Sequence, residues 1–136
     1  MGAKIRRLPN WQKGPSENQI QIAYVEWAEL RSRKIPELQL VYHIPNGSHK
    51  SPAARGLFKR LGQKAGVPDI HLPIGRGQYI GLWIEFKSDK GRISEVQKRW
   101  HKLLEASGHR VVMSKDWKEA ANITLDYLGI SPDFII

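Results

Sequence analysis

Residues 80–87 alternate between apolar and other side chains with the period of two that is typical of a β-strand. The apolar members share one face of that strand: Ile80, Leu82, Ile84 and Phe86. The opposite face carries Glu85 and Lys87, one pleat apart, beside Trp83. One face therefore needs a core packed against it, while the other presents an acid and a base at the same end of a strand.

A second carboxylate, that of Asp69, lies in an apolar run that predicts a strand over residues 67–72. The turn Gly75-Arg76-Gly77 leads from this run to the next strand, so a hairpin would bring Asp69, Glu85 and Lys87 to one patch. Two carboxylates match the oxygen ligands that Mg²⁺ takes from proteins, and a nearby lysine can hold or deprotonate a water. This combination predicts metal-assisted hydrolysis of a phosphodiester.

Two simpler interpretations stay open for the residues taken alone. Glu85 and Lys87 can form an ordinary pair on a solvated sheet face, where charged alternation is common. Asp69 can be a turn residue that follows a proline. The choice between these interpretations and a catalytic site depends on the rest of the chain.

The remaining sequence predicts an α/β fold in which helices flank a mixed β-sheet. A capping box of Ser16 and Gln19 starts the first helix, and Ser94 with Gln97 starts a later one. Gly108 fits the left-handed position that ends this later helix. The predicted order is α-β-α-ββ-α-β-α, with elements at residues 16–33, 38–44, 51–65, 67–72, 80–87, 94–108, 110–114 and 116–128.

Helical periodicity predicts which sides of the helices are apolar. The first helix has its apolar side centred on Ile20, Tyr24 and Trp27. Glu17 lies close enough to that side to approach the sheet, although a charge that only complements the helix dipole is the alternative. The helix after Ser94 is expected to bury a stripe of four residues: Val96, Trp100, Leu103 and Leu104.

The net charge favours a polyanionic partner. The 136 residues include 22 Lys and Arg against 13 Asp and Glu, a formal net charge of +9. Basic residues crowd the segment before and within the second helix, with no acidic residue between them: Lys50, Arg55, Lys59, Arg60 and Lys64. Lys90 and Arg92 add positive charge in the loop after Lys87. An unbroken single sign favours phosphate contacts, with a solvated helix face as the alternative.

Several functional classes lack the sequence features they need. The chain has no cysteine, which excludes disulfides and thiolate metal sites. Its histidines show no HExxH spacing, and no Gly-x-x-x-x-Gly-Lys-Ser/Thr loop supports a nucleotide cofactor. No apolar run reaches about 18 residues, and the basic start lacks the apolar stretch of a signal peptide. We therefore expect an intracellular protein without a membrane segment.

A series of motifs along the chain points to a known family. The motifs are Ser16-Glu17, His43-Ile44-Pro45-Asn46-Gly47, residues 57–69 ending in Gly66-Val67-Pro68-Asp69, Glu85-Phe86-Lys87, and Ser94-Glu95-Val96-Gln97 with Trp100. Together they resemble the virus-type replication–repair nuclease (VRR-NUC) family of the PD-(D/E)XK superfamily, over about residues 16–128. The resemblance implies a restriction-endonuclease-like fold, with residues 16–136 as a single nuclease domain after a basic arm of residues 1–15.

The resemblance also implies a metal-dependent DNA endonuclease that uses Mg²⁺ or Mn²⁺. Asp69 and Glu85 would ligate the metal, with the Phe86 carbonyl and Glu17, directly or through water, as further ligands. Lys87 would position the attacking water and steady the charge on the scissile phosphate. Gln97 would stand near the site, although its place in a capping box is an equally good structural reason for it.

Stand-alone members of this family are similar to Holliday-junction resolvases, which implies branched DNA as the substrate and a homodimer with paired sites. The alternatives are a non-catalytic basic DNA-binding module on the same fold, a flap or nicking nuclease, and an RNA-directed nuclease. Candidate dimer surfaces are the apolar end of the chain and the tryptophans, with core packing as the alternative for the latter: Phe134, Ile135, Ile136, Trp27, Trp100 and Trp117.

Overall fold

The structure, a computed structural model, describes residues 14–46 and 51–131 of the chain. Its elements are, in order, α1 (Glu17–Arg31), the 3₁₀ helix η2 (Pro36–Leu40), β1 (Tyr42–His43), α2 (Pro52–Arg60), β2 (Ile70–Leu72), β3 (Leu82–Phe86), α3 (Glu95–Ala106), β4 (Arg110–Ser114) and α4 (Trp117–Leu128). The predicted α/β class and the order α-β-α-ββ-α-β-α are confirmed, with η2 as an addition. The predicted basic arm, apart from its last two residues, lies outside the described ranges.

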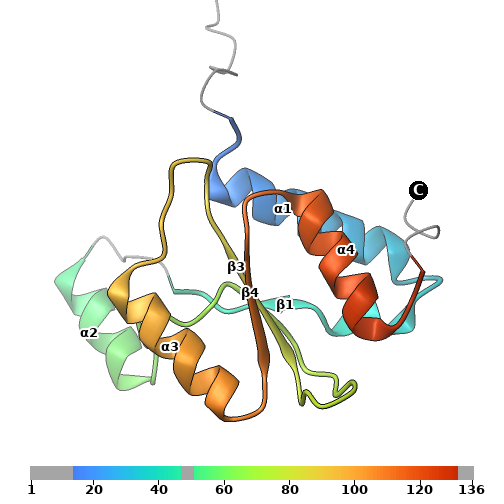
Figure 1. Ribbon diagram of the computed structural model, residues 1–136. Helices are drawn as coiled ribbons and strands as arrows, with labels where there is room; N and C mark the ends of the chain where they lie inside the picture. The colour runs from blue at the N-terminus through green and yellow to red at the C-terminus, as the bar shows by residue number, and fades with distance from the viewer. Residues whose placement is uncertain (1–13, 47–50, 132–136) are drawn as a thin grey trace, which may run out of the picture.

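The strands of the described ranges form one mixed sheet in the order β1-β2-β3-β4. β2 pairs antiparallel with β1 and with β3, so the predicted hairpin is present, whereas β4 runs parallel to β3 at the edge. Figure 1 shows the sheet between two layers of helices, with α1 and α4 on one side and α2 and α3 on the other. A different pair of helices therefore covers each face of the sheet.

The core lies between the sheet and the pair formed by α1 and α4. Leu82, Ile84 and Phe86 are fully buried on that face of β3, which confirms the alternation in this part of the strand. Tyr24 of α1 lies 5.5 Å from Phe86 between ring centroids, and its hydroxyl forms a 2.8 Å hydrogen bond with Thr124 Oγ1 of α4. The predicted apolar side of the first helix is buried as well: Ile20, Tyr24 and Trp27. This packing fixes β3, and with it the residues at its end.

Two predicted strands are shorter in the structure. The strand predicted at residues 38–44 is wrong for most of its length, because Pro36 starts a 3₁₀ helix and only Tyr42–His43 joins the sheet. The strand predicted at residues 67–72 begins only at Ile70, two residues after Pro68, which has no N–H for a ladder hydrogen bond.

Other boundaries need smaller corrections. Ile80, predicted to be in the core, lies before β3 with 58% of its surface exposed. The helices predicted at residues 16–33 and 51–65 end earlier, at Arg31 and Arg60. Gly108 has the predicted positive φ, +100°, just after α3.

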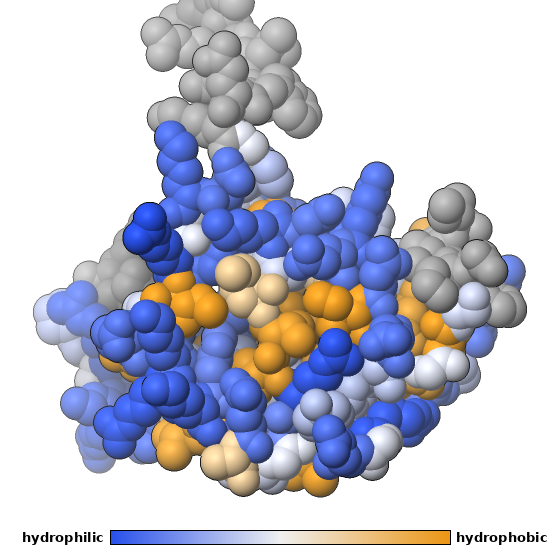
Figure 2. All heavy atoms as spheres, viewed as in Figure 1, coloured by the Kyte–Doolittle hydropathy of each residue, from blue (hydrophilic) through white to orange (hydrophobic). Residues whose placement is uncertain are grey.

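Helix α3 is less buried than its pattern predicts. Val96 and Leu103 keep 50% and 52% of their surface exposed, and Trp100 and Leu104 are half-buried, so the prediction of a buried stripe is wrong. The helix contacts β4 with part of its apolar side, and the rest of that side faces outwards. Figure 2 shows apolar residues at the surface among the polar ones on this view of the molecule. No helix in the described ranges is long and apolar enough to span a membrane.

Candidate active site

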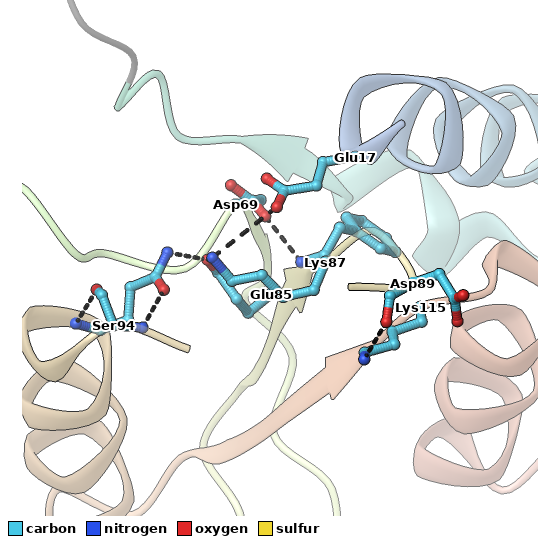
Figure 3. A network of polar contacts seen from close by, with 9 residues as sticks. Glu17, Asp69, Glu85, Lys87, Asp89, Ser94 and Lys115 are labelled. Atoms are coloured by element: carbon cyan, nitrogen blue, oxygen red, sulfur yellow. Dashed lines mark hydrogen bonds and ion pairs between the residues drawn. The ribbon is translucent and has the colours of Figure 1, made fainter. Parts of the chain in front are cut away.

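The hairpin brings the predicted acidic and basic residues together. Its antiparallel register places Asp69, which directly precedes β2, opposite Glu85 of β3. Lys87 directly follows β3 and shares the face of Glu85. Figure 3 shows these three side chains close to one another, with Glu17 approaching from the start of α1.

The Asp69 carboxylate is tied to the neighbouring strand. Its Oδ2 atom accepts a 2.8 Å hydrogen bond from the backbone N–H of Phe86. Burial raises the pKa of Asp69 above its ordinary value, and this hydrogen bond acts in the opposite direction. The backbone of β3 therefore holds the carboxylate beside Glu85, so its position does not depend on a free rotamer.

Glu85 is buried, with 2% of its surface exposed. Its Oε1 atom accepts a hydrogen bond from Gln97 Nε2, whereas its Oε2 atom has no hydrogen-bond partner among the described residues. Burial, and then the negative charge of Asp69, raises the pKa of Glu85 to about 8. Adjacent carboxylates at this depth are costly unless positive charge compensates them.

Gln97 closes a helix cap and also contacts Glu85. It closes the capping box of α3, because its N–H donates to Ser94 Oγ at 3.2 Å and its Oε1 accepts from Ser94 N at 2.9 Å. The amide oxygen is thereby used by the helix end, and the amide nitrogen points to Glu85. The cap of α3 therefore orients the Gln97 amide, and the amide in turn orients the Glu85 carboxyl group.

Lys87 lies between two acidic residues. It is buried, and its Nζ atom is 3.8 Å from Oε1 of Glu85 and 4.0 Å from Oε1 of Glu17. The Glu17 side chain keeps 47% of its surface exposed. Glu17 thus approaches the sheet as its helical position predicts, but it stands at the mouth of the site and contacts the lysine.

A pocket of about 300 Å³ lies at these residues, and Lys87 is not part of its lining. Four of the lining residues were predicted from the sequence: Glu17, Asp69, Glu85 and Gln97. Four more polar lining residues were not predicted as site residues: Asn18, Gln21, His43 and Asn46. His43 Nδ1 lies 2.8 Å from Asp69 O, and Asn46 Nδ2 donates a 3.2 Å hydrogen bond to Val67 O. Both therefore hold the loop that carries Asp69. Their place in a family motif was a usable signal, although no role could be predicted for either residue.

The donors present fit a hard divalent cation. A buried, unpartnered oxygen on Glu85 and raised pKa values on both carboxyl groups mark a place where more positive charge than that of Lys87 is stabilising. Mg²⁺ takes one or two carboxylates and completes its shell with water and phosphate. No three acidic or histidine side chains in the described ranges form a metal cage, so Glu17 does not complete a three-residue set in this arrangement.

The predicted phosphate contacts lie at the surface wherever they are described. Six basic residues are exposed, on or after α2 and in the loop after β3: Arg55, Lys59, Arg60, Lys64, Lys90 and Arg92. The seventh, Lys50, lies outside the described residues. Exposure is what a phosphate contact requires, and it leaves the alternative of a solvated helix face open.

His71 supports a tryptophan on the same side of the sheet. Its ring stacks on Trp83 with 3.9 Å between centroids and 12° between planes, and its Nδ1 atom lies 2.8 Å from the Tyr42 hydroxyl. Burial, and then the nearby His109, lowers the pKa of His71 to about 4. His71 is therefore a neutral packing residue at physiological pH.

This pKa has a consequence for stability in acid. The ordinary pKa is 6.5, so between pH 6.5 and about 4 the unfolded chain binds more protons at His71 than the folded chain does. The contribution of His71 to stability is therefore complete above pH 6.5 and is lost as the pH falls through this window. We expect His71→Phe, which keeps a stacked ring, to lose less unfolding free energy than the wild type between pH 7 and 4.5 in urea titrations. Parallel losses in the two proteins would contradict this.

Comparisons with known proteins bear on the family and the fold of the chain. The sequence profile of the VRR-NUC domain family matches residues 15–115. A solved structure named "VRR_NUC domain protein" superposes with a TM-score of 0.73 at 28% sequence identity, and the alignment covers 88% of this chain and 93% of that one. No curated protein matches the sequence.

Proposed function

The chain belongs to the VRR-NUC domain family, which is a nuclease family of the PD-(D/E)XK type, and on this basis we propose that it is a metal-dependent, structure-specific DNA endonuclease. The observation that carries the proposal is the pair of neighbouring carboxyl groups, Asp69 and Glu85, whose pKa values are both raised, with Lys87 beside them. A non-catalytic DNA-binding module has no physical reason to keep two carboxylates where it meets phosphate.

Each residue of the candidate site has a separate role in the proposed hydrolysis. Asp69 and Glu85 would hold Mg²⁺ or Mn²⁺, with the Phe86 carbonyl and, through water, Glu17 as further ligands. A bound metal of this kind supplies a Lewis acid for the phosphoryl oxygen. The Lys87 ammonium donates a hydrogen bond to the attacking water and steadies the charge that develops on the scissile phosphate. Gln97 holds Glu85 in the orientation that this requires.

Branched DNA is the substrate class we propose, with four-way junctions as the leading case. The test is a panel of labelled duplex, flap, nicked and four-way-junction DNAs and an RNA duplex, each incubated with Mg²⁺, Mn²⁺ or EDTA. We expect cutting of the junction with either metal and none in EDTA. Preferential cutting of flaps or nicks would replace the substrate, and binding to DNA without cutting under any condition would remove the nuclease assignment.

The basic residues of α2 and its C-terminal end are proposed to contact phosphates without regard to sequence. Neutralising Lys59, Arg60 and Lys64 together should weaken binding to all DNA sequences alike and lower the slope of log affinity against log salt by about one unit per lost contact. Fluorescence anisotropy at several salt concentrations measures both quantities.

A matched control separates these contacts from a change in net charge. Arg33 and Lys34 in the turn after α1, and Lys118 on α4, are exposed, so neutralising them removes the same charge from a different surface. We expect a small loss of affinity in that variant. Equal losses in the two triple variants would return α2 to an ordinary solvated face.

Paired cutting of a junction needs two sites at a fixed separation, so we propose a homodimer with two-fold symmetry. Trp27 lies in the core and the half-buried Trp117 packs against it, whereas the half-buried Trp100 is not part of this core cluster. The apolar end, residues 134–136, lies outside the described residues. Sedimentation equilibrium at micromolar protein should give twice the mass of the chain, and a monomer with and without junction DNA would contradict the proposal.

A further inference from the structure

A second pocket adjoins the candidate active site. It has a volume of about 450 Å³, within the range of roughly 300–1,000 Å³ that is usual for small-molecule sites. Phe58, Leu61, Trp83 and Trp100 line it, so three aromatic rings face one hollow between α2, β3 and α3. Val67 lines both this pocket and the pocket at the candidate active site, so the two pockets meet at the segment before Asp69.

Both tryptophans of this pocket are held in place. Trp83 stacks on His71, and its Nε1 atom donates a 3.1 Å hydrogen bond to His109 Nδ1. Trp100 packs closely on the loop, because a Cβ added to Gly66 would lie 2.9 Å from its Cδ1 atom. Rings that are already ordered lose little conformational entropy when a flat ligand stacks on them.

The positive charge at the pocket favours an occupant that carries a phosphate. Lys64 lines the pocket, and the exposed Lys59 and Arg60 lie just before it in the chain, with no acidic residue from residue 50 to residue 64. An apolar, aromatic floor with the Lys64 ammonium at its wall fits a nucleotide, whose base stacks while its phosphate meets this charge. A second copy of the chain docked at this pocket would instead bring the exposed Lys59, Arg60 and Lys64 of one copy towards those of the other.

We propose that this pocket accepts one unpaired nucleobase of the DNA substrate, next to the phosphodiester at the catalytic carboxylates. This inference rests on the proposed nuclease function and adds a reason for its substrate class. A base can enter the pocket only after it leaves its stack, which costs least at a branch, a flap or a single-stranded end. Fully paired duplex then binds through phosphates alone.

The test measures binding in EDTA, where no cutting occurs. The ligands are one oligonucleotide with 2-aminopurine, a fluorescent base whose emission changes on stacking, as a single strand and as a perfect duplex. We expect Trp100→Ala to weaken single-strand binding about ten-fold, the size of one lost base–aromatic stack, and to leave duplex binding unchanged. Trp100→Phe should keep most of the affinity. Phe58→Ala repeats the test without altering α3, and Leu103→Ala is the control on α3 itself.

Two results would overturn the assignment of this pocket to an unpaired nucleobase. One is an equal effect of Trp100→Ala and Phe58→Ala on single strand and duplex, or no effect of either, in variants whose thermal melts show a folded protein. The other is the dissociation of a dimer by these substitutions with no selective loss of single-strand affinity, which would assign the surface to a second copy of the chain. If the wild type cuts no DNA, while the variants still lose single-strand affinity selectively, the nuclease assignment is contradicted and the pocket assignment is not.

Discussion

Asp69→Asn is expected to lower the rate of DNA cleavage on the order of 10³-fold while DNA affinity stays at the wild-type level or rises. The metal contributes several kcal/mol to the transition state, and each 1.36 kcal/mol is a factor of ten in rate. An asparagine oxygen can still accept the hydrogen bond from Phe86 N, so the loop should keep its place. Removing a negative charge beside the DNA phosphates favours binding.

Glu85→Gln should have the same effect on cleavage, because it replaces the second carboxyl group of the pair, whose pKa is raised to about 8, with an amide that cannot ionise. Single-turnover cleavage and anisotropy binding, measured on the same preparations, separate chemistry from affinity. Glu26→Gln on the exposed side of α1 makes the same chemical change away from the pocket and should cut at the normal rate. An Asp69→Asn protein that cuts as fast as the wild type would eliminate the two-carboxylate mechanism.

Gly66→Ala should give the largest loss of stability of any single methyl group added to the loop before Asp69. Gly66 has a φ of +91°, and an added Cβ would lie 2.6 Å from Val96 Cγ1 and 2.8 Å from Val96 O. The left-handed backbone costs an L-residue about 1–2 kcal/mol, and overpacking costs about 1–3 kcal/mol more. We expect a loss of about 3 kcal/mol in urea unfolding, together with weaker cleavage as α3 and Gln97 shift away from Glu85.

Two other glycines separate the causes. Gly62 has a φ of +103° but meets no described atom within 4 Å, so Gly62→Ala should show the backbone cost alone. Gly56 lies within α2 with the same open space and no positive φ, so Gly56→Ala should stabilise the protein by about 0.5–1 kcal/mol. If Gly66→Ala costs no more than Gly62→Ala, the close packing of α3 on the loop is not important for stability.

The parts of the fold that depend on local chemistry were predictable. Both capping boxes, β4 at residues 110–114 and the helix that Asp116 caps follow from a few neighbouring residues each, and the structure has them at the predicted positions. The stretch from residue 36 to residue 44 failed because its alternating apolar residues fit a strand, while Pro36 favours a tight helical turn. Periodicity also identified the apolar side of α3, but it does not say whether any other element covers that side.

The candidate site was predictable as a set of residue types and less so as a geometry. The period of two placed Glu85 and Lys87 on one face, and the hairpin brought Asp69 to them. Two features required the folded chain: the bond from Phe86 N to Asp69, and the positions of His43 and Asn46 behind that loop. They join residues far apart in the sequence, and no local pattern specifies such partners.

The position of Gln97 limits which amino acids this chain can carry there. Glutamate and glutamine are interchangeable at N3 of an ordinary capping box, since either offers an oxygen to the backbone N–H of the cap residue. At Gln19 of α1 that oxygen is the only contact described for the side chain, so an acid would serve. At residue 97 the same exchange would replace an N–H donor with a third negative charge against Glu85. Both α1 and α3 begin with a capping box that has glutamine at N3. Gln19→Glu should therefore be neutral for folding, whereas Gln97→Glu should abolish catalysis.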